Sequence, residues 1–78
     1  MTFGERLKRY RELAGLSQNE LAKRARVSRP TISNVESGKY GGMNVENARR
    51  IARVLGITLD QLVGEGEIAP TDGALVLA

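Results

Sequence analysis

The chain has 78 residues and a formal net charge of +3, and it contains neither cysteine nor histidine. This length fits one domain with one hydrophobic core. The missing residue types exclude disulfides, thiolate or imidazole metal ligands, the commonest general base and the softest nucleophile. We therefore expect no metal, no cofactor and no enzymatic activity.

The charge is unevenly distributed. Residues 1–64 hold all twelve Lys and Arg against six Asp and Glu, whereas residues 65–78 hold three acids and no base. A basic body favours a polyanionic partner, with nucleic acid first and an anionic membrane second, although a basic surface can also serve solubility alone. No apolar run approaches the roughly 20 residues that cross a bilayer, and the first residues lack the layout of a secretory signal. We expect a soluble cytoplasmic protein without a membrane partner.

Helix-start signals recur through residues 1–64. Five Ser, Thr or Asn residues stand where an N-cap is expected, and three are followed three residues later by Glu or Gln, which completes a capping box. The caps are Thr2, Ser17, Ser28, Asn44 and Thr58, and the box partners are Glu5, Glu20 and Gln61. Glycines at 15, 38 and 56 stand where helices commonly end. The predicted helices are 3–14, 18–25, 29–37, 45–55 and 59–63.

The apolar residues of the first and fourth predicted helices each lie on one face. In residues 3–14 the buried stripe is Phe3, Leu7, Tyr10 and Ala14, and in residues 45–55 it is Val45, Ala48, Ile51, Ala52 and Leu55. No segment before residue 64 alternates as a strand does. The fold class is all-α, with five short helices around one core in a domain of residues 1–64.

The second and third predicted helices are joined by residues 26–28 alone. So short a link makes two helices cross steeply, as in a DNA-reading helix pair. The Val27 side chain is expected to be buried beneath the turn. The remaining core positions of this unit are Leu21, Ala25, Ile32 and Val35.

Residues 16–39, LSQNELAKRARVSRPTISNVESGK, resemble the helix-turn-helix of phage repressors and Cro proteins, the Xre-type or lambda-repressor-like family. Residues 51–64, IARVLGITLDQLVG, are similar to the helices that close that five-helix domain. The resemblance implies major-groove binding to double-stranded DNA. One departure is Arg26, where the family usually has glycine; a positive φ there would cost about 1 kcal/mol.

On the third predicted helix, Ile32, Val35 and Glu36 fall on one side at 100° per residue. The opposite arc is short, polar and nearly free of acids, and it provides the candidates for base reading. These are Arg29, Pro30, Thr31, Ser33 and Asn34. The Arg29 guanidinium can donate two hydrogen bonds to the O6 and N7 atoms of guanine, and the Asn34 amide can both donate to and accept from adenine. The alternative for each is an ordinary solvated side chain.

Candidates for phosphate contact flank this helix. The resemblance implies that Gln18 is a glutamine that contacts a DNA phosphate. It also implies contacts to the DNA backbone from the segment Ser37, Gly38, Lys39 and Tyr40. The last two residues would otherwise be plain loop surface. The resemblance also implies a structural ion pair between Arg11 and Glu36, the one acid on the core side of the reading helix.

Residues 65–72 resemble a linker, and residues 73–78, Gly-Ala-Leu-Val-Leu-Ala, form an apolar end. This end is either a disordered terminus or an edge strand that pairs with a second copy or with another protein. Because one helix-turn-helix reads few base pairs, we expect a homodimer on a palindromic site. The predicted function is a sequence-specific transcriptional regulator, most simply a repressor; the alternative is an antitoxin-like or adaptor module that binds a protein through residues 73–78.

Overall fold

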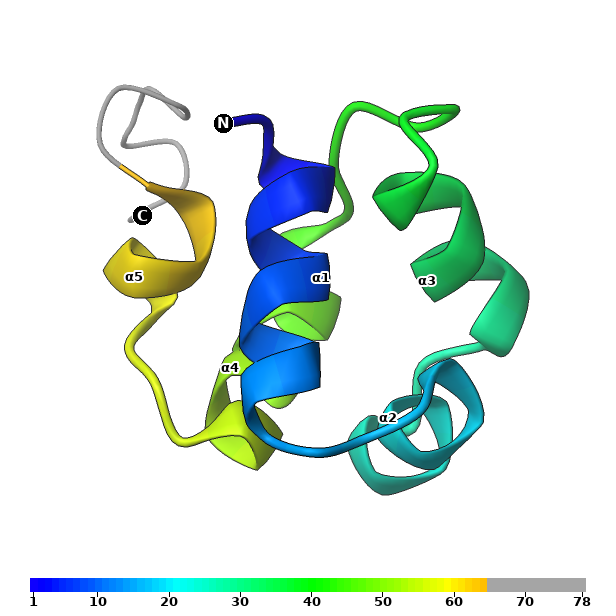
Figure 1. Cartoon of the computed structure of the whole chain (residues 1–78), viewed down its shortest axis with the longest axis vertical. Helices are drawn as coiled ribbons and strands as arrows, with labels where there is room; N and C mark the ends of the chain where they lie inside the picture. Colours follow the sequence, from blue (N-terminus) through cyan, green and yellow to red (C-terminus); the bar gives the residue numbers. More distant parts are fainter. Residues whose placement is uncertain (65–78) are drawn as a thin grey trace.

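The computed structural model describes residues 1–64, so the strand and partner predictions for residues 65–78 lie outside the described residues. Five helices follow one another along this part of the chain (Figure 1). They are α1 (Phe3–Leu13), α2 (Gln18–Ala25), α3 (Arg29–Glu36), α4 (Val45–Leu55) and α5 (Leu59–Val63). Within residues 1–64 no helix combines the length and the apolar character needed to span a membrane.

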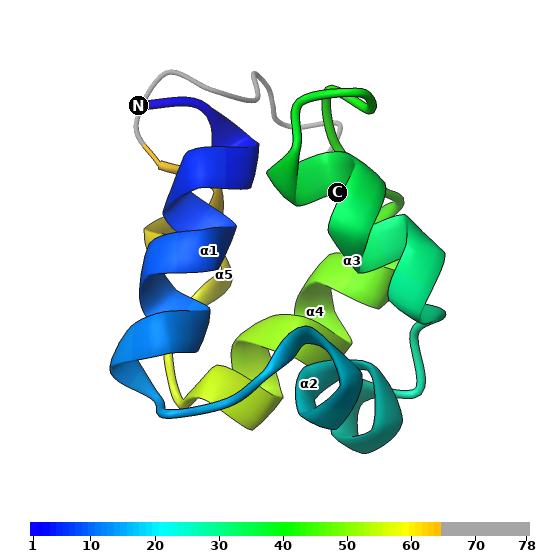
Figure 2. The same cartoon turned by 45° about the vertical axis from the view of Figure 1, so that its right-hand side comes forward.

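Helix α1 occupies the middle of the fold, with α3 on one side and α5 on the other, and it contacts both (Figure 1). Helix α4 also contacts α2 and α5, and Figure 2 places it behind the gap between α1 and α3. The α2–α3 pair therefore rests on α1 and α4, which leaves one side of α3 directed away from the body.

The core is built from apolar side chains of all five helices. The fully buried ones are Leu7, Leu21, Ile32, Val35, Ile51 and Leu62. Burial of each such side chain stabilises the fold by about 1.5–3 kcal/mol relative to exposure. The all-α prediction is confirmed for residues 1–64.

Every predicted N-cap is present, and all three capping boxes are formed in both directions. Helices α1 and α3 each end one residue earlier than predicted, at Leu13 and Glu36. The prediction that Ala14 is buried is wrong, because Ala14 is the C-cap of α1 and is exposed. The next place on the buried face after Phe3 and Leu7 belongs to Arg11, which is 9% exposed.

The backbone of α3 lies directly against α1 at Gly4. A Cβ atom at this position would overlap the backbone carbonyl oxygen of Val35. Because the obstacle is backbone, it cannot move aside as a flexible side chain would. A glycine at position 4 thus lets α3 lie this close to α1.

Candidate nucleic-acid interface

The turn between α2 and α3 is made by Arg26 and Val27. Arg26 is the C-cap of α2 and has φ 59° and ψ 42°, in the left-handed region. The N–H of Val27 donates to the carbonyl oxygen of Ala22 at 3.1 Å, and the Val27 side chain is 5% exposed. The turn is therefore closed by a buried side chain, with Arg26 at the surface in a conformation that glycine adopts more easily.

The start of α3 is held by two hydroxyl groups. Ser28 Oγ accepts the backbone N–H of Thr31 at 3.2 Å, and the two hydroxyl oxygens lie 2.7 Å apart. Pro30 is in the first turn, where its missing N–H breaks no helix bond. Sequence reasoning did not find the hydroxyl contact, although residues three apart at a cap are close enough to make it.

The two sides of α3 differ as the helical period predicts. Ile32 and Val35 are fully buried, and the Glu36 side chain is 3% exposed. Of the five predicted base-reading residues, Arg29 and Pro30 are exposed, and the other three are half-buried: Thr31, Ser33 and Asn34. Glu36 is the one acid in α3, so the outward side of this helix carries no carboxylate.

The segment after α3 folds back onto the end of the helix. The carbonyl oxygen of Asn34 accepts the N–H of Tyr40 at 3.0 Å and the hydroxyl of Ser37 at 3.1 Å. The N–H of Lys39 donates to Ser37 Oγ at 3.4 Å, and Gly38 has φ +89°. These bonds keep the exposed side chains of Lys39 and Tyr40 next to α3.

The start of α2 is the second segment predicted to contact phosphate, after residues 37–40. Ser17 Oγ accepts the N–H of Glu20 at 3.0 Å, and the Glu20 carboxylate accepts the N–H of Ser17 at 2.8 Å. The hydrogen bond from the Ser17 backbone lowers the pKa of Glu20 below its ordinary value. The N–H groups of Gln18 and Asn19 follow in the first turn, where a helix offers them no acceptor.

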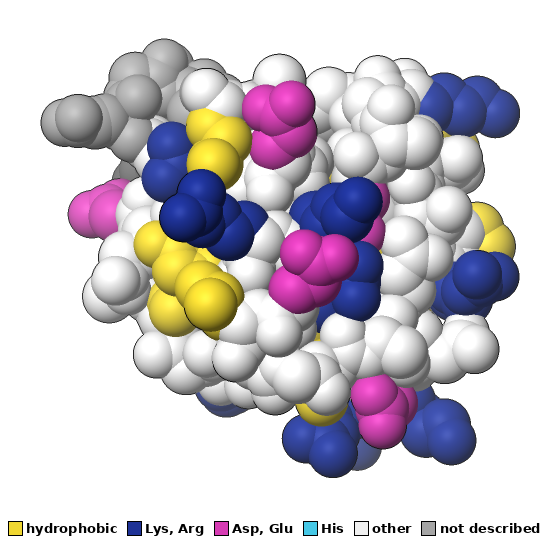
Figure 3. Space-filling model, viewed as in Figure 1, with side chains coloured by type: hydrophobic (Ala, Val, Ile, Leu, Met, Phe, Trp, Pro, Cys, Tyr) yellow, Lys and Arg dark blue, Asp and Glu magenta, His cyan; other side chains and the backbone are white. Residues whose placement is uncertain are grey.

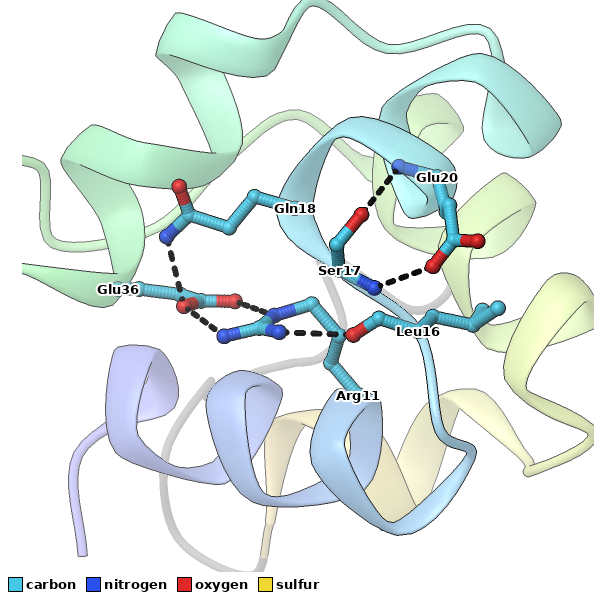
Figure 4. A network of polar contacts seen from close by, with 6 residues as sticks. All are labelled: Arg11, Leu16, Ser17, Gln18, Glu20 and Glu36. Carbon is cyan, nitrogen blue, oxygen red and sulfur yellow. Dashed lines mark hydrogen bonds and ion pairs between the residues drawn. The ribbon is translucent and has the colours of Figure 1, made fainter.

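A buried polar network connects the start of α2 to α3 (Figure 4). Arg11 Nε donates to Glu36 Oε2 at 2.7 Å and Arg11 Nη2 to Glu36 Oε1 at 2.9 Å, which is the pair that the resemblance implies. Arg11 Nη1 also donates to the carbonyl oxygen of Leu16 at 2.8 Å. The hydrogen bond to Glu36 raises the pKa of Arg11, and desolvation opposes this rise.

Gln18 joins the same network, which sequence reasoning missed. Its Nε2 donates to Glu36 Oε1 at 3.0 Å across 18 residues of chain. The Gln18 side chain therefore points toward the end of α3. The residue is half-buried, so part of it still reaches the surface. No local spacing rule connects two residues so far apart.

Exposed cations lie on α2, in the turn, on α3 and in the segment after it. These are Lys23, Arg24, Arg26, Arg29 and Lys39. In Figure 3, Lys and Arg side chains lie along the right-hand edge, on the side of α3, and along the lower edge below α2. A polyanion that approaches the start of α3 or the segment after α3 meets the positive charge of Arg29 or Lys39.

This geometry agrees with comparisons to known proteins. The helix-turn-helix family profile matches residues 7–62. The chain belongs to this family. The resemblance of residues 16–39 to phage repressors is confirmed by a further relative, the immunity repressor protein of Bacillus phage phi105, which is 34% identical over 83% of this chain and 44% of its own length.

Among the relatives of this helix-turn-helix chain is an uncharacterised HTH-type transcriptional regulator of Methanocaldococcus jannaschii, 40% identical over 73% of this chain and 85% of its own length. The HTH-type transcriptional activator BcrR of Enterococcus faecalis is 38% identical over 87% of this chain. The present chain spans only 33% of the length of BcrR.

The solved structures place the fold among those of the regulator SinR. The N-terminal DNA-binding domain of SinR from Bacillus subtilis has a TM-score of 0.78 at 27% identity, over 85% of this chain and 96% of that one. A crystal structure of SinR in complex with DNA has a TM-score of 0.76 at 28% identity, over 78% of this chain and 97% of that one.

Proposed function

We propose that this chain is a sequence-specific DNA-binding transcriptional regulator that inserts α3 into the major groove. The observation that carries the proposal is the contrast between the two sides of α3. Ile32 and Val35 are fully buried, whereas the outward side has an exposed start and stays partly exposed along the rest of its length. Eight residues at 1.5 Å each give a rod about 12 Å long. An α-helix with its side chains is about 10–12 Å across, which fits a major groove about 12 Å wide. SinR, a structural relative, is known in complex with DNA.

Base reading falls to the side chains on that outward side. Arg29, at the exposed start of α3, donates two hydrogen bonds to guanine, and Asn34 pairs with adenine. Ser33 bonds a base edge, and Pro30 offers apolar contact alone. Thr31 contributes its methyl group, because its hydroxyl already contacts Ser28.

Phosphate contacts come from both flanks and set the register of α3 in the groove. At the start of α2 they come from the Gln18 backbone N–H, favoured by the helix dipole, and from its amide. On the other flank they come from residues 37–40, with the Lys39 ammonium and the Tyr40 hydroxyl as donors. The Ser37 hydroxyl and the Gly38 N–H already donate to the carbonyl oxygens of Asn34 and Val35, so these two residues shape the contacting segment.

We further propose that the protein acts as a homodimer. A rod of about 12 Å covers roughly four base pairs, too few to select one site in a genome. Two copies that read half-sites about 34 Å apart double the sequence read. Light scattering of the chain alone, of the chain cut after Gly64, and of each with DNA measures the stoichiometry and tests whether residues 65–78 contribute to it.

Repression is the simplest outcome of such binding, because occupancy of a promoter blocks it without any further contact. The alternative of a protein-binding module that has lost DNA binding is less favoured, since the family relatives are transcriptional regulators. A reporter gene placed behind the selected site distinguishes repression from activation.

The decisive experiment is selection from a pool of random duplexes with the purified protein. We expect enrichment of one inverted repeat, measured by sequencing over successive rounds. Equal recovery of all sequences, or recovery that falls to background at 150 mM salt, would remove the proposal.

Two substitutions then separate base reading from phosphate contact on the selected duplex. Arg29→Ala should cost about 1–3 kcal/mol and relax preference at one base pair. Lys39→Ala should weaken all duplexes alike and reduce the slope of log affinity against log salt by about one. Titrations at four salt concentrations, with matched and mismatched duplexes, measure both effects.

A further inference from the structure

The Glu36 carboxylate joins three segments that are separate in sequence. It accepts two hydrogen bonds from Arg11 of α1 and one from Gln18, the first residue of α2, and it stands at the last position of α3. An ion pair with Arg11 would account for its burial. It does not account for the third bond, to a half-buried side chain at the proposed phosphate-binding flank.

The third bond restricts the Gln18 amide. A carboxylate only accepts hydrogen bonds, so it selects the orientation in which Nε2 faces Glu36, and a flipped amide would set two oxygens against each other. One N–H of Nε2 is then used, and the second remains available to an oxygen from outside the protein. The Leu16 carbonyl, held by Arg11 Nη1, restrains the backbone that leads into the same turn.

We propose that Glu36 is a positioning residue for DNA binding: it holds the Gln18 amide, before DNA arrives, in the orientation that meets a backbone phosphate. The inference rests on the proposed function. A side chain already held in its binding conformation loses less freedom on association than a free one, so the contact contributes more affinity. Glu36 itself touches no DNA.

A double-mutant cycle tests this coupling with the selected duplex as probe. Arg11→Met/Glu36→Met removes the acceptor for Gln18 while keeping the net charge unchanged. We expect Gln18→Met to weaken binding about fivefold to tenfold in the wild type and less than twofold in the Arg11→Met/Glu36→Met background. Asn19→Met is the matched control, because Asn19 is exposed on the same turn, and its effect should be equal in both backgrounds.

A second measurement needs only the wild-type protein and covers the case in which the double variant does not fold. Nuclear magnetic resonance of the side-chain amides should give the Gln18 NH₂ slower proton exchange than that of Asn19, with one Gln18 proton shifting when the duplex is added. Equal factors for Gln18→Met in both backgrounds, or Gln18 exchange as fast as that of Asn19, would overturn the inference. Failure of the wild type to bind any duplex would instead overturn the proposed function.

Discussion

Within residues 1–64, two Arg–Glu pairs have nearly equal lengths and opposite surroundings. Arg11 and Glu36 lie 2.7 Å apart with side chains 11% and 3% exposed. Arg50 and Glu46 lie 2.8 Å apart with side chains 44% and 71% exposed. The first pair joins α1 to the end of α3, whereas the second lies on one face of α4, four residues apart.

The length of an ion pair therefore does not measure what the pair does for the fold. Water solvates both partners of the exposed pair whether or not they meet, so their attraction is nearly cancelled. The buried pair is desolvated, so the charge of each partner is stabilised by the other and by one further hydrogen bond. Gln18 donates to Glu36, and Arg11 donates to the carbonyl oxygen of Leu16. Removal of one partner should therefore have very different consequences at the two sites.

The largest effect is expected for Glu36→Ala. It leaves the Arg11 guanidinium buried without its counter-charge, so the free energy of unfolding should fall by about 3–5 kcal/mol. Urea denaturation followed by circular dichroism measures the change. Arg29→Ala, on the outward side of the same helix, should stay within about 0.5 kcal/mol of wild type. Equal stabilities of these two variants would break the comparison.

Removing both buried partners should be milder than removing one. In Arg11→Met/Glu36→Met no charge is left unpaired, and apolar side chains of similar length fill the space. We expect this double variant to recover more than half of the stability lost in Glu36→Ala, as read from the urea midpoints at constant slope. A double variant as unstable as Glu36→Ala would mean that the ion pair itself contributes net stability.

The exposed pair should respond weakly. Glu46→Ala removes one i,i+4 interaction on α4, and the free energy of unfolding should fall by about 0.3–0.5 kcal/mol. Repeating the urea titration in 1 M salt should erase most of that difference, since salt screens exposed charges. Asp60→Ala, which removes another exposed acid from the first turn of a helix, serves as a control for the loss of a carboxylate. A loss above 2 kcal/mol for Glu46→Ala would contradict the argument from exposure.

The smallest effect concerns an acid that is bonded to backbone. The pKa of Glu20 is lowered in the folded protein from its ordinary 4.5, so its contribution is present above pH 4.5 and is lost as pH falls through the folded-state value. Glu20→Gln keeps an acceptor without a titrating proton, as Gln61 does at Thr58. The stability advantage of wild type over Glu20→Gln should shrink as the pH falls from 5 to 2. A constant difference across that range would contradict a stabilising role for the ionised Glu20 carboxylate.

Sequence patterns located the helices because the signals are local. Each cap joins residues three apart, and each apolar stripe repeats within one helix, so neither depends on the rest of the fold. The same locality explains the error at Ala14. Counting apolar residues placed Ala14 on the buried face of α1, whereas the tertiary contact with Glu36 buries Arg11 there instead.

In the candidate site, too, some features follow from local sequence patterns and others from tertiary contacts. The outward arc of α3 follows from the helical period, so Arg29 and Asn34 could be nominated from the sequence. The bond between Gln18 and Glu36 spans 18 residues and exists only because α1 and α4 support α2 and α3 in one arrangement. Helix positions and faces were thus determined by short-range hydrogen bonding and periodicity. Which polar groups meet in the interior was decided by packing, because a buried charge must find its partners wherever the fold brings them.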